Sequence, residues 1–336
     1  MWCETLAKRR CHMYRYAAGY FDLIGLSRNV LCSMPMLLMC DVEGEKDGKY
    51  WRIVLMKKVI IAGLLLVLSG CSSQFMYNNL DWMIHWYLDD YIDLNKGQRK
   101  LFDEQFSIWH GWHRNEELAK YVAQLEQARG LIAEDKMTKA DVDQQFNEAR
   151  NHWIILRNRI APDLIDIAVT LSDEQVADLF SAMSKENQKE QEKLDELYAK
   201  SEQKRIEKRQ NDIEENLEEW MGRLTSEQKT IIKRYVGQFR PNWQNWLVYQ
   251  RHIQSEARKL FDTRNANADF QSQLLQLMTN PESYRHKELN ENSEFNSALF
   301  SDLTWEVLQT ITPKQRAELL DTIDDYIDDF SDLRKG

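Results

Sequence analysis

Two histidines and a glutamate at helical spacing are the first residues whose side chains could do chemistry together. His110, His113 and Glu117 fall at i, i+3 and i+7, so on a helix they could approach one divalent ion. Trp109 and Trp112 lie beside them, which favours the alternative of a half-buried, hydrogen-bonded histidine pair. The sequence has no HExxH pattern to supply a general base. The set is therefore an incomplete metal motif, and we predict no catalytic residue from it.

A second candidate is a run of aromatic residues spaced by three. Trp243, Trp246 and Tyr249 follow Arg240 and Pro241, at which a helix should kink. Stacked aromatic rings beside an arginine could bind a sugar, a glycan strand or an apolar peptide. The other interpretation is that the stripe packs in the core of the protein.

Aspartates crowd one face of the last predicted helix. Asp325 and Asp329 belong to this group, in which neighbouring carboxylates oppose each other and the helix dipole. Something positive should lie opposite, or solvent should surround the aspartates. Arginines of another helix are one interpretation, and calcium or a basic partner is the other. The spacing typical of EF-hand calcium sites is missing from this sequence.

Residues 56–70, MKKVIIAGLLLVLSG, have the order of parts found in a secretory signal peptide. Lys57 and Lys58 precede an apolar run at 59–68, which is shorter than the roughly 20 residues of a membrane-spanning helix. A buried helix that ends in Gly-Cys is the alternative. The order of charge, apolar length and small residues favours the signal peptide.

The end of this segment, Leu68-Ser69-Gly70-Cys71, resembles the lipobox of bacterial lipoproteins. The resemblance implies cleavage after Gly70 and a covalent lipid, with palmitate among its acyl chains, at Cys71. It implies no other cofactor. Ser72 is the kind of residue that follows the lipidated cysteine in lipoproteins sorted to the outer membrane. We therefore expect a lipid-anchored outer-membrane protein that faces the periplasm.

An export signal works at an N-terminus, so residues 1–55 are expected to be a non-native, unstructured upstream extension, with Met56 as the start. They carry four of the five cysteines, Cys3, Cys11, Cys32 and Cys40. A disulfide or metal framework is the alternative for these four, but it would need an organised domain around it.

The mature domain, expected at 71–336, contains no cysteine after Cys71, so packing must stabilise it. It carries 34 Lys and Arg against 48 Asp and Glu, a net charge of −14. Such a charge repels nucleic acid and anionic lipid. Membrane attachment should therefore come from the acyl chains. A periplasmic protein partner or client is expected as well.

The composition after residue 70 predicts an all-α fold, an extended multi-helix bundle. Six glycines and four prolines occur there, and no sustained apolar/polar alternation indicates strands. One helix, 173–221, should be very long and highly charged, either as a hairpin arm, a dimer seam or a cradle for a client. The domain could form two lobes, 76–170 and 171–336. The expected helices are 76–92, 96–130, 139–170, 173–221, 226–263, 267–279, 294–310 and 313–333.

Four similar helix starts support these boundaries, each with a capping residue and a glutamine three positions later. Their unequal spacing argues against a solenoid. Their Leu-Thr-x-x-Gln pattern resembles the motif of the Spy/CpxP class of periplasmic helical chaperones, although ordinary helix capping explains it too. The cap and glutamine pairs are Asn95 and Gln98, Ser172 and Gln175, Thr225 and Gln228, and Thr312 and Gln315.

The block Tyr77-Asn78-Asn79-Leu80-Asp81-Trp82, continued by Trp112-His113-Arg114, is similar to an uncharacterised family of proteobacterial helical lipoproteins. That resemblance implies a lipid-anchored helical protein and no particular activity. Motifs for nucleotide binding or a nucleophile elbow are missing from the sequence. We therefore expect an interaction or scaffold protein, in the manner of a chaperone, and favour a non-enzymatic role. The alternative is a hydrolase of envelope glycans or lipids that uses His110 and His113.

Overall fold

The computed structural model describes residues 72–335. The expectations for residues 1–55, for the signal segment 56–70 and for Cys71 lie outside the described residues and stay predictions. The chain separates into two compact units, and the second runs from Ile84 to Lys335. Of the first unit, the structure describes residues 72–83, which form α4 (Ser72–Asn78) and the start of α5 (Leu80–Asp89).

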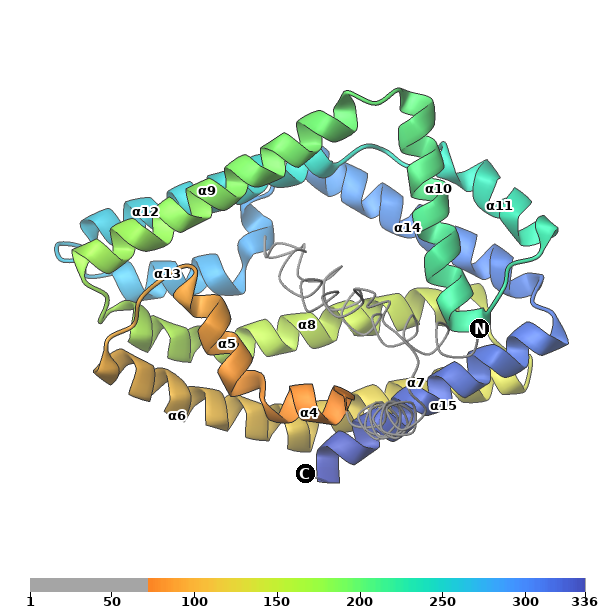
Figure 1. Ribbon diagram of the computed structural model, residues 1–336, viewed down its shortest axis with the longest axis horizontal. Coiled ribbons are helices and arrows are strands. Elements are labelled where there is room, and N and C mark those ends of the chain that lie inside the picture. The colour runs from red at the N-terminus through yellow and green to blue at the C-terminus, as the bar shows by residue number, and fades with distance from the viewer. Residues whose placement is uncertain (1–71, 336) are drawn as a thin grey trace, which may run out of the picture. The chain divides into compact units, whose positions relative to one another are not determined.

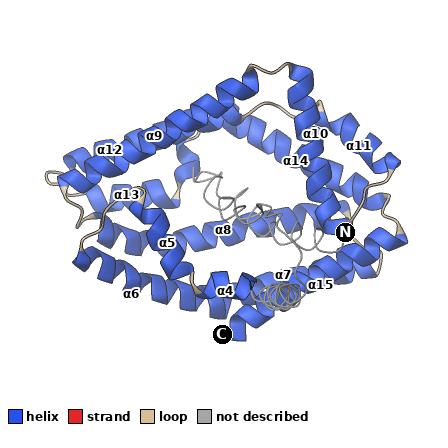
Figure 2. Ribbon diagram, in the orientation of Figure 1, coloured by secondary structure: helices blue, strands red, loops and turns tan. Residues whose placement is uncertain are grey.

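The described residues form helices and loops, and no strand occurs among them (Figure 2). The all-α fold predicted from the sequence is confirmed. None of the helices in residues 72–335 combines the length and hydrophobicity needed to cross a bilayer. After α5 the elements are α6 (Lys96–Trp112), a π-helical turn (His113–Glu117), α7 (Leu118–Ala133), α8 (Lys139–Ala168), α9 (Asp173–Tyr198), α10 (Glu202–Met221), α11 (Ser226–Val236), α12 (Trp243–Thr263), α13 (Phe270–Thr279), a 3-10 turn (Pro281–Tyr284), α14 (Lys287–Gln309) and α15 (Pro313–Lys335).

The charged segment predicted as one very long helix over 173–221 is instead two helices, α9 and α10. The break has a local cause, because the Ser201 side chain accepts from the backbone N–H of Lys204 and caps α10. A similar correction applies at Pro241, where the expected kink is a full break between α11 and α12. The helix expected to begin at residue 294 begins earlier, at Lys287.

All four predicted capping boxes are present. Asn95, Ser172 and Thr225 each accept from the backbone N–H of the glutamine three residues on, and that glutamine accepts from the cap's backbone N–H. Thr312 does the same with Gln315, over 3.2 Å and 3.1 Å. Thr138 forms a fifth box, which uses Asp141 in place of a glutamine.

The four glutamines also bind one another in two pairs, which we call the first and second glutamine clasps. In the first clasp, Gln98 and Gln175 donate to each other's side-chain oxygen over 3.0 Å and 2.7 Å. In the second, Gln228 and Gln315 do so over 3.1 Å and 2.8 Å. Each clasp therefore ties together two helix starts that lie far apart in the sequence.

The remaining amide hydrogens complete the same pattern in both clasps. Each glutamine donates to the backbone carbonyl two residues before its partner's cap. The acceptors are Thr170 for Gln98, Asp93 for Gln175, Thr310 for Gln228 and Arg223 for Gln315. The two clasps thus repeat one geometry within a single chain, and they satisfy the polar atoms of glutamines that are mostly buried.

Helices that are far apart in the sequence pack side by side (Figure 1). The α7 helix lies along α15, which starts at the second clasp, and α12 lies along α9, which starts at the first. One hydrophobic core includes Phe102, Trp109 and Phe261, and a second includes Ile232 and Val307. Each core contains residues from both sides of position 170. The division into two lobes, 76–170 and 171–336, stays a prediction.

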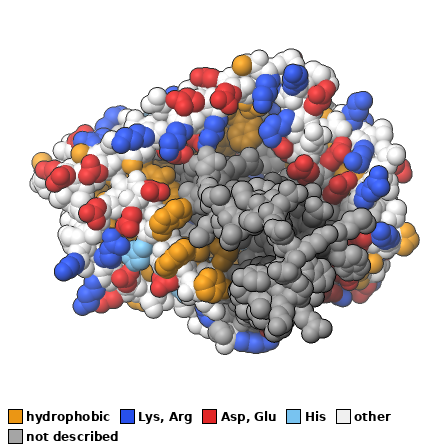
Figure 3. Space-filling model, viewed as in Figure 1, with side chains coloured by type: hydrophobic (Ala, Val, Ile, Leu, Met, Phe, Trp, Pro, Cys, Tyr) orange, Lys and Arg blue, Asp and Glu red, His pale blue; other side chains and the backbone are white. Residues whose placement is uncertain are grey.

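The outer faces of α9 and α10 are charged and solvated. Figure 3 shows basic and acidic side chains interspersed along this edge of the molecule. Lys189 pairs with Glu186 over 3.0 Å, and Lys208 pairs with Asp212 over 2.8 Å. Such exposed pairs contribute little to stability, so packing on α12 and α15 is what holds these helices in place.

Candidate functional site

A π-helical turn interrupts the long helix formed by α6 and α7. It covers His113–Glu117, and single π turns inside α-helices often occur at functional sites. The extra residue in such a turn changes which side chains face inward. Glu117 is fully buried as a result, and so is Leu118, which is 1% exposed. A carboxyl group is seldom buried in this way without a partner.

The two oxygens of Glu117 have different surroundings. Oε1 accepts a hydrogen bond from Lys120 Nζ, and the Lys120 side chain is 50% exposed. Oε2 lies 3.9 Å from Nδ1 of His152 on α8, which is too far for a hydrogen bond. Neither of these two atoms has a hydrogen-bond partner in the described structure.

The tautomer of His152 follows from Gln124 on α7. The Gln124 side-chain nitrogen donates to the backbone oxygen and to Oε1 of Gln145, each over 3.0 Å. Its Oε1 is therefore the acceptor for His152 Nε2, at 2.9 Å. A neutral His152 then carries its proton on Nε2 and presents a lone pair at Nδ1.

Burial lowers the pKa of His152, which keeps the ring neutral, and the carboxyl groups of Glu117 and Glu148 oppose this effect. Two acceptors, Nδ1 and the Glu117 Oε2, therefore face each other. A hydrogen-bond donor that satisfied both atoms would have to lie to one side of the line that joins them, because 3.9 Å leaves no room for another heavy atom between the two.

Tyr121 joins His113 to this cluster. Its hydroxyl lies 3.3 Å from His113 Nε2, and its ring contacts that of His152 edge-on, with centroids 4.5 Å apart. Phe330 of α15 packs on the same tyrosine at 5.9 Å. Desolvation lowers the pKa of His113 to about 4, partly offset by Glu117 and reinforced by His110. Both histidines of the cluster are therefore neutral at pH 7.

A sequence model for a family of unknown function (DUF6279) matches residues 90–290. The match spans more than half of the chain. The chain belongs to this family. The matched segment includes the π-helical turn, His152 and the first glutamine clasp, but it ends before Gln315 and Phe330. No curated protein and no solved structure matches the chain.

The predicted metal candidates do not form one ligand set. His113 and Glu117 lie in the π-helical turn, whereas the His110 ring stacks on Phe106 with centroids 5.6 Å apart. Within residues 72–335, no three His, Cys, Asp or Glu side chains are grouped as metal ligands would be. Tyr121 and Gln124 of α7 and His152 of α8 complete the polar cluster instead. His152 could not be predicted from the nearby sequence, because its contact with α7 is long-range.

The aromatic run divides between surface and core. Trp243 is 49% exposed, whereas Tyr249 is buried and donates to the backbone oxygen of Pro281 over 3.0 Å. Burial raises the pKa of the Tyr249 hydroxyl. Trp246 is partly buried beneath the guanidinium of Arg285, which lies 4.9 Å from its ring centroid. Of the three aromatic residues predicted to bind a ligand, Trp243 is the one that a partner could reach most readily.

Arg129 on α7 supplies the positive charge expected opposite the aspartates of α15. It donates to both oxygens of Asp324, over 2.5 Å and 2.8 Å. Asp325 is exposed and Asp329 partly buried. The arginine interpretation therefore holds at Asp324, and the binding roles predicted for Asp325 and Asp329 stay predictions.

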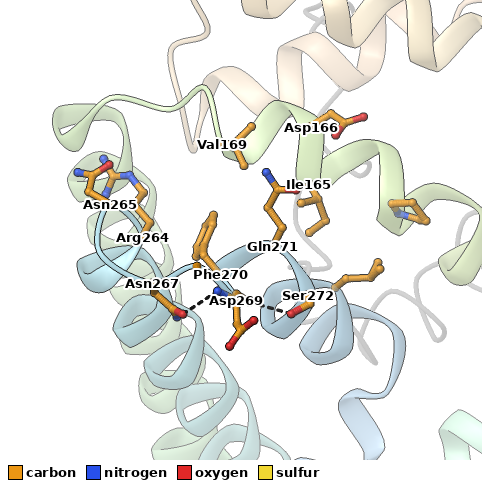
Figure 4. A pocket seen from close by; sticks show the side chains of 13 residues that line it. Ile165, Asp166, Val169, Arg264, Asn265, Asn267, Asp269, Phe270, Gln271 and Ser272 are labelled. Carbon is orange, nitrogen blue, oxygen red and sulfur yellow. Dashed lines mark hydrogen bonds between the residues drawn. The ribbon is translucent and has the colours of Figure 1, made fainter.

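An open groove of about 760 Å³ lies between the end of α8 and the start of α13 (Figure 4). Its polar groups bond locally, because Asn267 Oδ1 accepts from the Asp269 backbone over 3.0 Å and Ser272 donates to the Asp269 carbonyl over 2.9 Å. Arg264 at its rim pairs with Asp173. These groups are therefore engaged with each other, and nothing in the groove converges on a ligand.

Proposed function

We propose that the chain is a lipid-anchored interaction protein of the outer membrane, with its helices in the periplasm. Support for the anchor comes from the sequence, in which Lys57, Lys58 and an apolar run precede Cys71. Acyl chains on Cys71 would hold the protein to the membrane, since two or more chains anchor stably. The helical domain would then bind a periplasmic protein, in the manner of a scaffold or a chaperone.

The observation that carries the binding role is the exposure of two aromatic side chains, Trp243 on α12 and Phe295 on α14. Hydrogen bonds at Arg240 and Asn242 hold these two helices together, and we call the aromatic pair, with Arg240, the aromatic surface. Large apolar side chains are usually buried, yet Trp243 is 49% exposed and Phe295 is 37% exposed. The guanidinium carbon of Arg240 lies 4.0 Å from the Phe295 ring centroid. Trp and Arg are the residues that most often dominate binding energy at protein interfaces.

Hydrogen bonds fix this surface to α14. The Arg240 backbone N–H donates to Asn296 Oδ1 over 2.9 Å, and Asn296 Nδ2 donates back to the Arg240 carbonyl over 2.9 Å. Asn242 adds a bond to Ser293 over 3.0 Å. A surface held in this way loses little conformational entropy when a partner binds.

The net charge restricts the partner. With 34 basic and 48 acidic residues over 71–336, nucleic acid would be repelled. An apolar segment of a periplasmic protein, flanked by basic residues, would complement both the aromatic surface and the acidic domain. An unfolded client has such segments exposed.

Photocrosslinking in cells tests this role. A photoreactive amino acid replaces Trp243, and the matched control carries it at Tyr198, an aromatic residue that is 39% exposed on α9. We expect a discrete protein adduct from position 243 and none from position 198. Equal adducts at both positions, or none at 243, would contradict a binding role for this surface.

A hydrolase of envelope glycans or lipids is the second candidate function. The facing acceptors Glu117 Oε2 and His152 Nδ1 favour it, because a water beside them that reached both could be polarised by both. The full burial of Glu117 weighs against it, since a substrate must reach that water. Release of fragments from peptidoglycan or phospholipid by wild-type protein, lost in Glu117→Gln, would favour the hydrolase over the binding protein.

A further inference from the structure

Two of the most exposed large apolar side chains of the described chain lie close behind the proposed lipid attachment site. Phe75 on α4 is 66% exposed, and Trp82 on α5 is 64% exposed. Trp86, four residues further along α5, is 54% exposed. Single exposed apolar residues are common on protein surfaces, but a group of exposed aromatic residues often marks a site that contacts a protein or a membrane.

Phe75 and Trp82 lie on two successive helices, α4 and α5, which are separated by a turn at Asn79. The Asn79 backbone N–H donates to the Phe75 carbonyl over 3.1 Å at the end of α4. The Met83 N–H donates to the Asn79 carbonyl over 3.4 Å at the start of α5. We call Phe75 and Trp82 the exposed aromatic pair.

The place of the exposed aromatic pair in the sequence identifies what it contacts. Phe75 comes four residues after Cys71, and the segment from Ser72 to Trp82 would extend about 15 Å at the helical rise of 1.5 Å per residue. Acyl chains at Cys71 would therefore keep Phe75 and Trp82 within a short distance of the bilayer. Asp81 is the one ionisable carboxylate or amine in the sequence from 72 to 83.

Tryptophan suits the border between lipid and water. Its ring is largely apolar and its indole N–H can still bond to headgroups or water, which is why Trp is enriched at membrane interfaces. The net charge of −14 over 71–336 would oppose strongly anionic lipid but not zwitterionic lipid. Low charge in this segment removes the main cost of contact with headgroups.

We infer that α4 and the start of α5 lie in the headgroup region of the membrane, with Phe75 and Trp82 inserted at its apolar boundary. This inference rests on the proposed lipid attachment at Cys71. It adds a second contact between the chain and the membrane, beside the acyl chains.

Quenching by brominated lipid tests the inference on the full chain. The protein is expressed with its signal, purified and reconstituted in vesicles of phosphatidylethanolamine and phosphatidylcholine whose acyl chains carry bromine. Trp82→Phe should reduce the lipid-quenched part of the tryptophan fluorescence. The control Trp243→Phe, the same substitution at a tryptophan that is 49% exposed, should reduce the unquenched part.

Incorporation of labelled palmitate is measured on the same preparations, and it separates the two proposals. If palmitate is incorporated but Trp82 is not quenched, this inference alone is overturned, and the exposed aromatic pair would then bind a protein partner. Failure to incorporate palmitate would overturn the lipid anchor and this inference with it. Palmitate incorporated and quenching lost in Trp82→Phe would establish both.

Discussion

Gln228 and Gln315 lie 87 positions apart in the sequence, yet each donates a hydrogen bond to the other's side-chain oxygen. Gln228 is fully buried and Gln315 is 4% exposed. The side-chain oxygen of each glutamine also accepts from the backbone N–H of its own cap residue, so the same two side chains cap two helices and bond to each other. The first clasp, Gln98 with Gln175, repeats this arrangement.

Removing one glutamine of the second clasp should destabilise the fold measurably. Gln228→Ala deprives Gln315 and the Thr310 carbonyl of buried partners, which should cost about 2 kcal/mol or more in the free energy of unfolding. The control Gln188→Ala, on the exposed face of α9, should change the free energy of unfolding by less than about 0.5 kcal/mol. Urea denaturation followed by circular dichroism measures both. Equal, small effects would show that the clasp does not stabilise the helix starts.

A double-mutant cycle separates the clasp from its two caps. Because Gln228 and Gln315 share bonds, the loss in Gln228→Ala/Gln315→Ala should be smaller than the sum of the two single losses. Additive losses would mean that the two caps act independently and that the clasp bonds contribute nothing.

His113 should make stability depend on pH. Its pKa is lowered from 6.5 to about 4, so as pH falls through this interval the unfolded chain takes up a proton before the folded chain does. Stability should therefore fall between pH 6.5 and pH 4, by at most about 3 kcal/mol. Urea denaturation across this range should show a flatter slope in His113→Phe. An unchanged slope in His113→Phe would contradict this origin of the pH dependence.

Asp324 should contribute stability that, like the His113 effect, falls as pH falls, but in a more acidic range. The hydrogen bonds from Arg129 lower the pKa of this carboxyl below 3.8. The advantage of wild type over Asp324→Asn should therefore be present at neutral pH and disappear as pH falls through the lowered pKa. Because both side chains are more than a third exposed, the advantage should be small and should shrink with added salt. An advantage that does not decline as the pH is lowered below 3.8 would exclude the ion pair as its cause.

The π-helical turn offers a test of the facing acceptors. Glu117→Ala removes a fully buried side chain and should cost about 2–4 kcal/mol in the free energy of unfolding. Glu117→Gln should cost less, because its amide can still accept from Lys120 and can donate toward His152. The exposed neighbour Glu116→Gln serves as a control. If Gln proves as harmful as Ala, the charge of Glu117 rather than its shape is required.

Local signals in the sequence predicted the helix starts well. The caps at Asn95, Ser172, Thr225 and Thr312 need only their own first turn, so short-range chemistry sufficed. The break before Ser201 was missed although serine is a good cap, because the charged residues around it are strong helix formers.

The pairing of those starts was beyond the reach of local reasoning. A glutamine in a capping box looks the same whether or not a second glutamine lies against it. The same limit explains the candidate site, because the π-helical turn changes the inward face by one residue and places Glu117 beside His152 of another helix. Neither the π-helical turn nor the contact with His152 can be recognised from the nearby sequence.

Metabolic labelling with palmitate tests the central claim most directly, because the proposed location, partner and membrane contact all depend on acylation of Cys71. Cells expressing the wild-type chain or Cys71→Ala are labelled, and the outer-membrane fraction is separated. We predict a labelled protein in that fraction for the wild type and none for Cys71→Ala. An unlabelled wild type, or label retained by Cys71→Ala, would contradict the account.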